Sequence, residues 1–431
     1  MAGTLRSDVK EHARPPLSVR FYYGWIIVVT VALTMAVVYG FRYSFSVFFV
    51  AILDEFGWER ASTAAILSVN IFVYGLFVVP AGVLVDRFGP RVVIPLGAAI
   101  LTVAILLSSR ANDQWHFFLL FGVIAAVGIA MGGYVPNFVV LTNWFVKRRG
   151  TAFGIAQAGN GGSFVLAGLA QVLIATVGWR NAYVILGSVF GGLVILLTVF
   201  LLRRYPRDLG LEPDGDSPDD AVETKPGPRH ALQVVDEAWV NTHWTVGLAV
   251  KTGRFWALFF ANMLLWGFGF ALLVAHQAAY ARDAGHGTAV IALMVGMYGV
   301  VNIAGNLLGF LSDRYGREPV YTLGIICASL GVVALILAAA PDRGWLLLAY
   351  SVLFGFGLGL AAPSQSASLA DLFQGPNFGS INGLLVTSFG IGGSIGPWLA
   401  GFIYDRTQTY LPAFLLSLAS VLLACVLIWI A

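Results

Sequence analysis

Long apolar runs constrain the fold of this chain more than any other feature of its sequence. A helix needs roughly 20 residues to cross about 30 Å of hydrocarbon, and the runs are of about that length or longer. Each run must form a helix, because a backbone amide in lipid is satisfied only within its own segment and the runs lack the polar alternation of barrel strands. We identify twelve spans, at residues 22–50, 60–85, 92–109, 115–141, 151–176, 181–202, 256–281, 287–312, 319–339, 345–371, 379–404 and 411–430.

The composition supports a membrane protein. Hydrophobic residues make up 58% of the 431 residues and charged residues 11%, whereas about a quarter of the residues of a soluble protein are charged. The net charge of +3 is too small to indicate a nucleic-acid partner. The two cysteines, Cys327 and Cys425, lie in different apolar runs. We therefore expect no disulfide framework, no metal site and no cofactor.

A polar interruption divides the spans into two sets of six. It is rich in proline and acidic residues, which indicates a solvated linker. The predicted fold class is an all-α membrane protein with twelve transmembrane helices in two pseudo-symmetric six-helix bundles. The predicted organisation is a cytoplasmic N-terminal tail at residues 1–21, the first bundle at 22–202, a cytoplasmic linker at 203–254 and the second bundle at 255–431.

Basic residues are distributed unequally between the two sides of this arrangement. With a cytoplasmic amino terminus, eighteen of the 25 Lys and Arg residues fall in cytoplasmic segments and six in outer loops. The positive-inside rule then places both termini in the cytoplasm. We expect a multi-pass protein of the plasma or inner membrane that is surrounded by the lipid bilayer and is a monomer.

One short motif occurs at the same place in both halves, in a shared Gly-x-x-x-Asp-Arg-x-Gly frame 227 positions apart. Its residues, with the arginines that follow, are Gly82, Asp86, Arg87 and Arg91 after the second span and Gly309, Asp313, Arg314 and Arg317 after the eighth. Glycine allows close helix approach, the aspartate can face the amino terminus of a neighbouring helix, and arginines suit the anionic cytoplasmic leaflet. The frame resembles the cytoplasmic loop signature of the major facilitator superfamily. That resemblance implies two bundles that rock around a central site, with these loops gating the change.

Within that superfamily the chain resembles the monocarboxylate porters and the related bacterial oxalate/formate group. The stretches that carry the resemblance are Gly24-Trp25, Phe45-Ser-Val-Phe-Phe49, Trp144 to Gly159, Gly178-Trp179-Arg180 and Gly210-Leu-Glu-Pro-Asp-Gly215. The most specific part is Lys147-Arg-Arg-Gly150 leading to Ala158-Gly159. The resemblance implies transport of small monocarboxylates, often with a proton.

The eighth span departs from the pattern of this family. Animal members carry an Asp and an Arg one helical turn apart there, whereas this chain has Asn302 and Asn306. The first-span lysine of the family falls at Tyr43, with Arg42 immediately before it. An amide can donate hydrogen bonds to a carboxylate but cannot neutralise it. An anion site must therefore take its positive charge from another residue.

Arg42 is the candidate for that charge. A cation inside a span costs roughly 2.5–3.5 kcal/mol even on the mild insertion scale, so it normally faces a cavity or a partner. No acidic residue is predicted at the same depth, and a bound substrate anion is the expected partner. The alternative is that the side chain extends to the outer headgroups, because Arg42 lies past the middle of its span.

His276 is the candidate for proton coupling, in the seventh span. Imidazole titrates near neutral pH, which suits a proton carrier where no buried carboxylate exists. The oxalate/formate relatives often have a histidine in this region, which implies a place in the cavity. Tyr280 is four residues further along and shares its face. A packing role for His276, hydrogen-bonded between helices, fits the sequence equally well.

Further polar residues inside the spans are costly to expose to lipid, so we expect most of them to face inward. For any single amide, a hydrogen bond between helices is at least as plausible a role as substrate contact. The predicted substrate-binding set, besides Arg42, Tyr43, His276 and Tyr280, is Asn70, Tyr74, Tyr134, Asn137, Gln157, Tyr298, Asn302, Asn306 and Gln365.

These observations favour a secondary active transporter of a small monocarboxylate or related organic anion. It would work by alternating access, and would be either proton-coupled or exchange one anion for another. A multidrug or neutral-solute carrier is the alternative, favoured by the missing eighth-span charges and the amide-rich lining. The sequence contains no nucleophile elbow, zinc helix motif or nucleotide-binding loop, so we do not expect an enzyme or an ATP-driven pump.

Overall fold

The structure of this chain is a computed structural model that describes residues 22–58, 60–215, 239 and 242–431. Every regular element among these residues is a helix, which confirms the predicted fold class. The predicted tail at 1–21 and the middle of the predicted linker lie outside the described residues.

The first half holds the elements that precede the linker. They are α1 (Gly24–Phe56), α2 (Arg60–Phe88), α3 (Pro90–Ser108), α4 (Gln114–Phe117), the π-helical η1 (Phe118–Ala125), α5 (Ala126–Gly132), α6 (Tyr134–Trp144), α7 (Arg149–Leu186), the π-helical η2 (Gly187–Gly191) and α8 (Gly192–Leu201). Two short 3₁₀ turns follow in the linker, η3 (Pro206–Leu209) and η4 (Pro213–Gly215).

The second half begins after the short helix α11 (Val246–Ala249). Its elements are α12 (Gly253–Asn262), the π-helical η5 (Met263–Ala271), α13 (Leu272–Asp283), α14 (Thr288–Leu307), α15 (Phe310–Tyr315), α16 (Arg317–Leu337), the 3₁₀ turn η6 (Pro341–Arg343), α17 (Gly344–Phe373), α18 (Phe378–Thr407) and α19 (Leu411–Ile430).

Eleven helical stretches of the described chain are long and apolar enough to cross a membrane, and one of them covers two predicted spans. This stretch, Arg149–Leu201, has 53 residues, and a straight helix of that length would extend roughly 80 Å, far more than the hydrocarbon thickness. It does not run straight, because Gly178 has non-helical angles of φ 80° and ψ 159°. The positive φ suits glycine, and it separates the fifth predicted span from the sixth.

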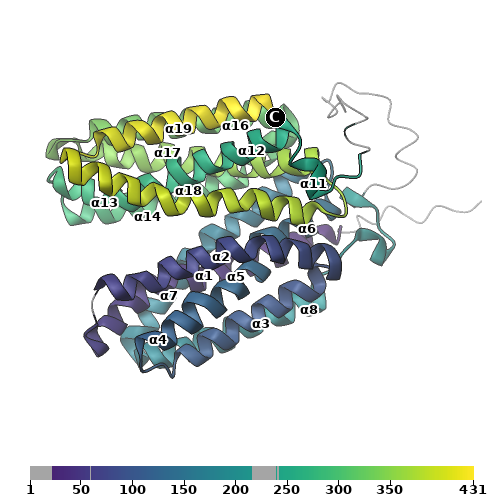
Figure 1. The fold of residues 1–431 in the computed structure, drawn as a ribbon, viewed down its shortest axis with the longest axis horizontal. Coiled ribbons are helices and arrows are strands. Elements are labelled where there is room, and N and C mark those ends of the chain that lie inside the picture. The colour runs from purple at the N-terminus through teal and green to yellow at the C-terminus, as the bar shows by residue number, and fades with distance from the viewer. Residues whose placement is uncertain (1–21, 59, 216–238, 240–241) are drawn as a thin grey trace, which may run out of the picture.

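The two halves form separate bundles that lie side by side in Figure 1, the first coloured purple to blue and the second green to yellow. Within the first bundle α1 packs along α7 and α3 packs against α5. Within the second, α17 packs against both α14 and α16. Across the boundary, α2 packs against α18 and α7 against α14. These two helix pairs hold the halves together.

Glycine allows the closest crossings within and between the bundles. A Cβ atom on Gly128 of α5 would lie 2.7 Å from the backbone nitrogen of Leu101 and 2.8 Å from the carbonyl oxygen of Gly97, both on α3. Between the halves, a Cβ on Gly82 would collide with the carbonyl of Gly379. Backbones therefore touch directly at these points, as small residues permit in membrane bundles.

Large apolar side chains cover the outside of both bundles. Phe72 is 60% exposed, Leu76 58% and Trp398 65%. Exposure of this kind suits lipid as the surrounding solvent, because a soluble protein of this size would not leave so many apolar side chains in water.

We expect Gly128→Ala to destabilise the first bundle by about 1–3 kcal/mol, because the new methyl group would separate α5 from α3. Gly168→Ala is the matched control, since a Cβ there has no neighbour within 4 Å. Thermal unfolding of the purified protein in detergent measures both variants. Equal midpoints for the two variants would contradict the close crossing.

Candidate functional site

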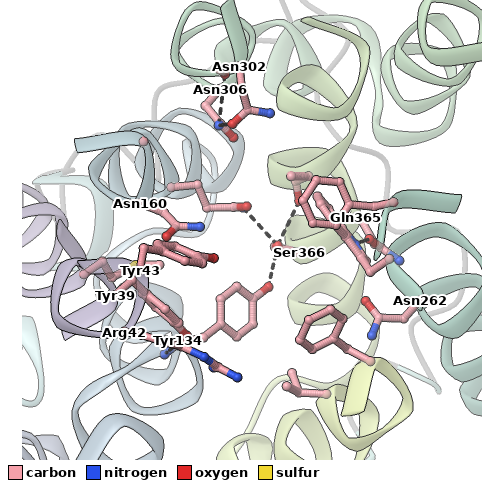
Figure 2. A pocket seen from close by; sticks show the side chains of 18 of the residues that line it. Tyr39, Arg42, Tyr43, Tyr134, Asn160, Asn262, Asn302, Asn306, Gln365 and Ser366 are labelled. Carbon is pink, nitrogen blue, oxygen red and sulfur yellow. Dashed lines mark hydrogen bonds between the residues drawn. The ribbon is translucent and has the colours of Figure 1, made fainter. Parts of the chain in front are cut away.

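A central cavity of about 320 Å³ lies between the two halves. Both bundles contribute to its wall, with aromatic rings and amide side chains facing each other across it (Figure 2). Nine of the thirteen residues predicted to bind substrate line this cavity. They are Arg42, Tyr43, Tyr74, Tyr134, Gln157, Tyr298, Asn302, Asn306 and Gln365.

Arg42 is a buried cation in the wall of this cavity. Its side chain comes from α1, is 7% exposed, and has its guanidinium carbon 4.8 Å from the centre of the Tyr74 ring. Figure 2 shows the guanidinium reaching past Tyr134 toward the open space. No acidic side chain of the described chain forms an ion pair with it. Contact with the ring face stabilises the cation but leaves its charge available.

The fourth span is broken beside this cation. At Gly133 the backbone leaves the helix, with φ −93° and ψ −142°, and α6 begins at the next residue. A Cβ on Gly133 would collide with the carbonyl of Ile129. The side chain of Asn137 bridges the break by donating to the carbonyls of Gly132 (2.8 Å) and Gly133 (2.7 Å). The break places the amino terminus of α6 at Tyr134, a residue that lines the cavity.

Two tyrosines connect that helix terminus to the cavity wall. The backbone N–H of Tyr134 donates to the hydroxyl oxygen of Tyr39 at 3.2 Å. The hydroxyl of Tyr39 lies 3.4 Å from that of Tyr74, the ring on which Arg42 rests. Because a backbone N–H can only donate, the Tyr39 oxygen accepts there, whereas in the contact between Tyr39 and Tyr74 either hydroxyl can be the donor.

Ser366 of α17 joins the halves in the middle of the cavity. Its hydroxyl donates to the carbonyl of Ala362 at 2.9 Å. The Ser366 oxygen is 2.7 Å from the hydroxyl of Tyr134 and accepts from the Gln157 amide at 3.2 Å. Since the Ser366 proton is used on its own helix, both side chains of the first half act as donors to it (Figure 2).

The wall contributed by the second half is made of amides and aromatic rings. Asn262 donates to Ser388 at 2.8 Å, and the Trp266 indole donates to the side-chain oxygen of Gln365 at 2.9 Å. The Asn306 amide donates to the side-chain oxygen of Asn302 at 2.9 Å. The eighth-span amides therefore bond to each other, and no charge replaces the pair that the family carries there.

The structure places four of the predicted substrate-binding residues outside the cavity lining, namely Asn70, Asn137, His276 and Tyr280. Asn70 is fully buried within the first bundle and donates to the carbonyl of Phe121 at 2.7 Å. Asn137 holds the break in the fourth span. Both follow the alternative expectation, an amide that bonds helix backbones together instead of contacting substrate.

His276 and Tyr280 connect helices of the second bundle to each other. The Nε2 atom of His276 lies 2.9 Å from the carbonyl of Pro397 and must carry a proton there, because a carbonyl only accepts. The Nδ1 atom is 3.4 Å from the hydroxyl of Tyr410. The Tyr280 hydroxyl donates to the carbonyl of Ile336 at 3.0 Å. The expected position of His276 in the cavity is thus corrected, because its ring is held between α13 and α18.

The duplicated motif closes the molecule at one end, which we call the linker end because residues 203–215 and 242–254 lie there. Asp86 accepts from the backbone N–H groups of Gly379 (2.9 Å) and Ser380 (2.7 Å) at the start of α18, and from the Ser380 hydroxyl. Asp313 accepts from the N–H groups of Gly150 (2.7 Å) and Thr151 (2.8 Å) at the start of α7.

Each aspartate therefore caps a helix of the opposite half, where the helix dipole favours a negative charge. The expectation that these aspartates face the amino terminus of a neighbouring helix is confirmed. Gly82 and Gly309 give the close backbone approach that this contact needs. The arginines of the motif differ: Arg87, Arg91 and Arg314 are exposed, whereas Arg317 is buried.

A buried ionic cluster that the sequence analysis missed lies beside the second copy of the motif. Arg149, at the start of α7, is 2.6 Å from Asp371 of α17, and its other nitrogen donates to Gln374 at 2.7 Å. Arg317 pairs with the second oxygen of Asp371 at 3.0 Å and with Asp313. The signal in the sequence was the basic run Lys147-Arg-Arg149, but Asp371 stood at a predicted helix end with no visible partner.

Several residues of the cavity wall were also missed, namely Tyr39, Asn262, Trp266 and Ser366. Tyr39 is one turn before Tyr43, Asn262 and Trp266 are one turn apart in the seventh span, and Ser366 follows Gln365. Helical spacing groups Tyr39 with Tyr43 and Asn262 with Trp266, but it does not group Ser366 with Gln365, because adjacent residues of a helix do not share a face.

Comparison with known proteins identifies the family. The family model of the Major Facilitator Superfamily matches this chain in two overlapping stretches, 31–365 and 307–431. The chain belongs to the major facilitator superfamily. Among curated relatives in this superfamily, monocarboxylate transporter 11 of Homo sapiens is 28% identical over 404 residues, which cover 92% of this chain and 80% of that protein. Monocarboxylate transporter 3 of Rattus norvegicus is 27% identical over 409 residues, covering 93% and 78%.

Solved structures of major facilitator proteins share the fold. The proton:xylose symporter XylE, bound to 6-bromo-6-deoxy-D-glucose, has a TM-score of 0.72 and 14% identity, and the match covers 94% of this chain and 95% of XylE. A bacterial homologue of the iron transporter ferroportin, in an outward-facing state, has a TM-score of 0.68 and 17% identity, covering 95% and 99%.

The resemblance to the monocarboxylate transporter-like members of the major facilitator superfamily is confirmed by these relatives. The chain is a multi-pass membrane transporter of a small molecule, and not an enzyme. Major facilitator proteins bind their substrates between their two halves, and the cavity of this chain lies between its two bundles.

We expect His276→Ala to lower the unfolding temperature and to leave the pH profile of uptake unchanged, because the imidazole joins α13 to α18 outside the cavity. His276→Gln, which can still donate to the carbonyl of Pro397, should recover part of the lost stability. Uptake into proteoliposomes between about pH 5 and pH 8 brackets the range in which histidine titrates. A flattened pH profile in either variant would instead support the proton-coupling role predicted from the sequence.

Proposed function

We propose that this protein is a secondary active transporter of a small monocarboxylate or related organic anion, working by alternating access. The observation that carries the proposal is the position of Arg42. It is a buried guanidinium with no acidic partner among the described residues, and it lines the cavity between the halves. The names of the relatives, monocarboxylate transporters, agree with an anionic substrate.

Electrostatics favour an anion as the occupant of this cavity. Two opposite charges 4 Å apart attract by about 4 kcal/mol at an effective dielectric constant of 20. A carboxylate can form two parallel hydrogen bonds with a guanidinium, which adds geometric selectivity. A neutral solute would leave the cation of Arg42 without a counter-charge, so binding an anion relieves the cost of holding that charge in the bilayer.

The tyrosines beside Arg42 supply a further donor. The N–H of Tyr134 donates to Tyr39, and the hydroxyls of Tyr39 and Tyr74 are 3.4 Å apart. These two hydroxyls share one hydrogen bond, so one of their two protons is left for an acceptor in the cavity. A carboxylate resting on Arg42 would accept it.

The size of the cavity favours a small substrate. A volume of about 320 Å³ is at the small end of the range for ligand pockets. The rings of Trp266, Phe270 and Phe389 supply an apolar surface in the part of the wall that the second half contributes. A short carbon chain attached to one carboxylate fits both features.

The closed linker end supports alternating access. The halves are joined there by Asp86, Asp313 and Arg149, and these contacts must break before the cavity can open to that side. Placing both termini in the cytoplasm of a plasma or inner membrane, as the basic loops favour, makes this conformation closed toward the cytoplasm. A monomer suffices for this mechanism, since one chain contains both halves.

Anion exchange is the coupling that the lining favours. None of the described residues that line the cavity is an aspartate, a glutamate or a histidine. Net movement of an anion with a proton would need a group in the pathway that titrates near neutral pH. In exchange, one anion moves inward for each anion that moves outward, so no proton is needed to balance the charge. Proton symport through His276 is the second form of coupling, and it requires that ring to leave its bond with Pro397.

Transport of a neutral solute is the second candidate function. The mutual bonding of Asn302 and Asn306 favours it, because the eighth-span charges of the family are absent and the wall of the second half is made of amides and rings. The two candidates differ in the class of compound that competes for the cavity.

Counterflow in proteoliposomes separates these candidates. We expect unlabelled lactate, pyruvate, oxalate or formate inside the vesicles to drive accumulation of the same labelled anion from outside. Exchange requires no pH gradient, so accumulation should persist when the gradient is collapsed. Absence of counterflow with all four anions would favour the neutral-solute carrier.

We expect Arg42→Gln to weaken binding of the transported anion by about 2–5 kcal/mol, which is roughly 30-fold or more in Kd. Arg42→Lys should retain part of the affinity, because the charge remains while the paired hydrogen-bond geometry is lost. Arg343→Gln is the matched control, since Arg343 is an exposed arginine in η6 away from the cavity. Isothermal titration of the purified proteins measures the effect. Wild-type affinity in Arg42→Gln would remove Arg42 as the anion anchor.

A further inference from the structure

The stretch Gly210-Leu-Glu-Pro-Asp-Gly215 has no part in the cavity or in the aspartate caps. It lies in the linker, directly after the first bundle, and ends in the turn η4. Its aspartate, Asp214, is 7% exposed, which is unusual for an acidic residue in a linker. A buried carboxylate needs donors around it, and the structure shows where they come from.

Asp214 binds the turn between α6 and α7. One carboxylate oxygen accepts from the backbone N–H groups of Val146 and Lys147, each at 2.8 Å. The other oxygen accepts from the N–H of Arg148 at 3.1 Å. Three successive backbone amides therefore converge on one carboxylate, as in the backbone sites that bind anions.

The backbone around Asp214 is adapted to this contact. Asp214 has φ 59° and Gly215 has φ 76°, so two consecutive residues are left-handed. A non-glycine residue adopts that conformation only where its surroundings impose it. A Cβ on Gly215 would lie 2.8 Å from the ring of Tyr22, whose hydroxyl donates to the carbonyl of Trp144 at 2.9 Å. The segment is thus packed against the same turn that Asp214 binds.

The start of the linker is fastened to this turn at two more points. The indole of Trp144 donates to the carbonyl of Arg203 at 3.0 Å, and the amide of Asn143 donates to the carbonyl of Arg204 at 3.3 Å. We call residues 203–215 the linker brace. It runs from the end of α8 to Asp214 and is bound along the turn that leads into α7.

The turn held by Asp214 positions Arg149, the arginine that joins the halves. The Nε atom of Arg149 donates to the carbonyl of Phe145 at 3.0 Å, inside the same turn. Its two terminal nitrogens are thereby directed at Asp371 and Gln374 of the other half. Arg149 is 3% exposed, so loss of this direction would leave a buried charge poorly paired.

The far end of the linker contacts the segment that carries Asp371, the residue with which Arg149 forms its ion pair. The Trp239 indole donates to the carbonyl of Leu372 at 2.8 Å, and the Asn377 amide donates to the carbonyl of Trp244 at 2.9 Å. Leu372 follows Asp371 directly. The described ends of the linker therefore touch the two segments that supply the bridge between Arg149 and Asp371.

From this geometry we infer that the linker brace sets the conformational equilibrium of the transporter, with Asp214 as a positioning residue that acts through Arg149 to favour closure of the linker end. The inference rests on the alternating access of the proposed function and not on the identity of its substrate. A linker that served only as a tether would have no effect on this equilibrium.

Distances between spin labels at the linker end test the inference without a substrate. Labels are attached through Phe88→Cys at the end of α2 and Tyr315→Cys at the end of α15, two exposed positions in opposite halves. The native cysteines are replaced by Cys327→Ala and Cys425→Ala. In the full-length protein in lipid nanodiscs, we expect Asp214→Asn to lower the ratio of the short-distance to the long-distance population about fivefold or more. Turnover should fall, with the KM of the transported anion within about twofold of wild type.

Asp208→Asn is the matched control, because Asp208 lies in the same brace but is exposed and accepts only locally, from the N–H of Tyr205 at 3.1 Å. It should leave the distance distribution unchanged. The Asp371→Asn background supplies a second control. If Asp214 acts through Arg149, Asp214→Asn should add little once Asp371 can no longer pair with that arginine.

A wild-type distance distribution in Asp214→Asn would overturn the inference, and so would equal shifts in Asp214→Asn and Asp208→Asn. An undiminished effect in the Asp371→Asn background would show that Asp214 does not act through Arg149. If Asp214→Asn does not yield folded protein, Gly215→Ala loosens the brace without changing its charge and should shift the distances in the same direction. Failure of the proposed function would be seen separately, as absence of anion transport in the wild type while the distances still respond to Asp214→Asn.

Discussion

A guanidinium inside a membrane bundle needs a counter-charge, and this requirement divides the buried arginines of the protein into two kinds. Arg149 and Arg317 are paired with Asp371 and Asp313, and their charges hold the halves together. Arg42 rests on the face of Tyr74 and has no acidic partner in the described chain. The paired charges account for the closed linker end. The uncompensated charge is the reason for proposing an anion as substrate.

The internal duplication gives the two halves related but unequal tasks. Asp86 in the first copy and Asp313 in the second have the same structural role, since each caps a helix of the opposite half. The arginine after the second copy, Arg317, is drawn into the ionic cluster, whereas Arg91 after the first copy is exposed. Closure therefore depends on hydrogen bonds alone at α18 and on hydrogen bonds plus buried ion pairs at α7. When a carboxylate leaves a helix terminus, water can solvate its charge, so such a contact suits the alternating access that we propose.

The features that depend only on spacing along the chain were predicted correctly from the sequence. The apolar runs, the two halves and the duplicated loops depend on spacing along one chain, and the structure confirms them. Arg42 was placed from the same reasoning, because a charge inside a span must face something other than lipid. Side chains whose partners lie on other helices could not be assigned in this way. His276 satisfies the same polarity rule by bonding to Pro397, and Asn137 by bonding across the break at Gly133. The sequence did not predict the ion pair between Asp371 and Arg149, because 222 residues separate them.

The sequence by itself determined that the chain is helical, that it spans the membrane in two sets of six and that few charges enter the bilayer, because lipid imposes these features on each segment independently. Only the tertiary structure decided which polar residues share one cavity and which join helices to each other. It also decided that Asp214 binds the turn beside Arg149. Those outcomes depend on which helices lie side by side and how each is rotated, and packing between segments sets both.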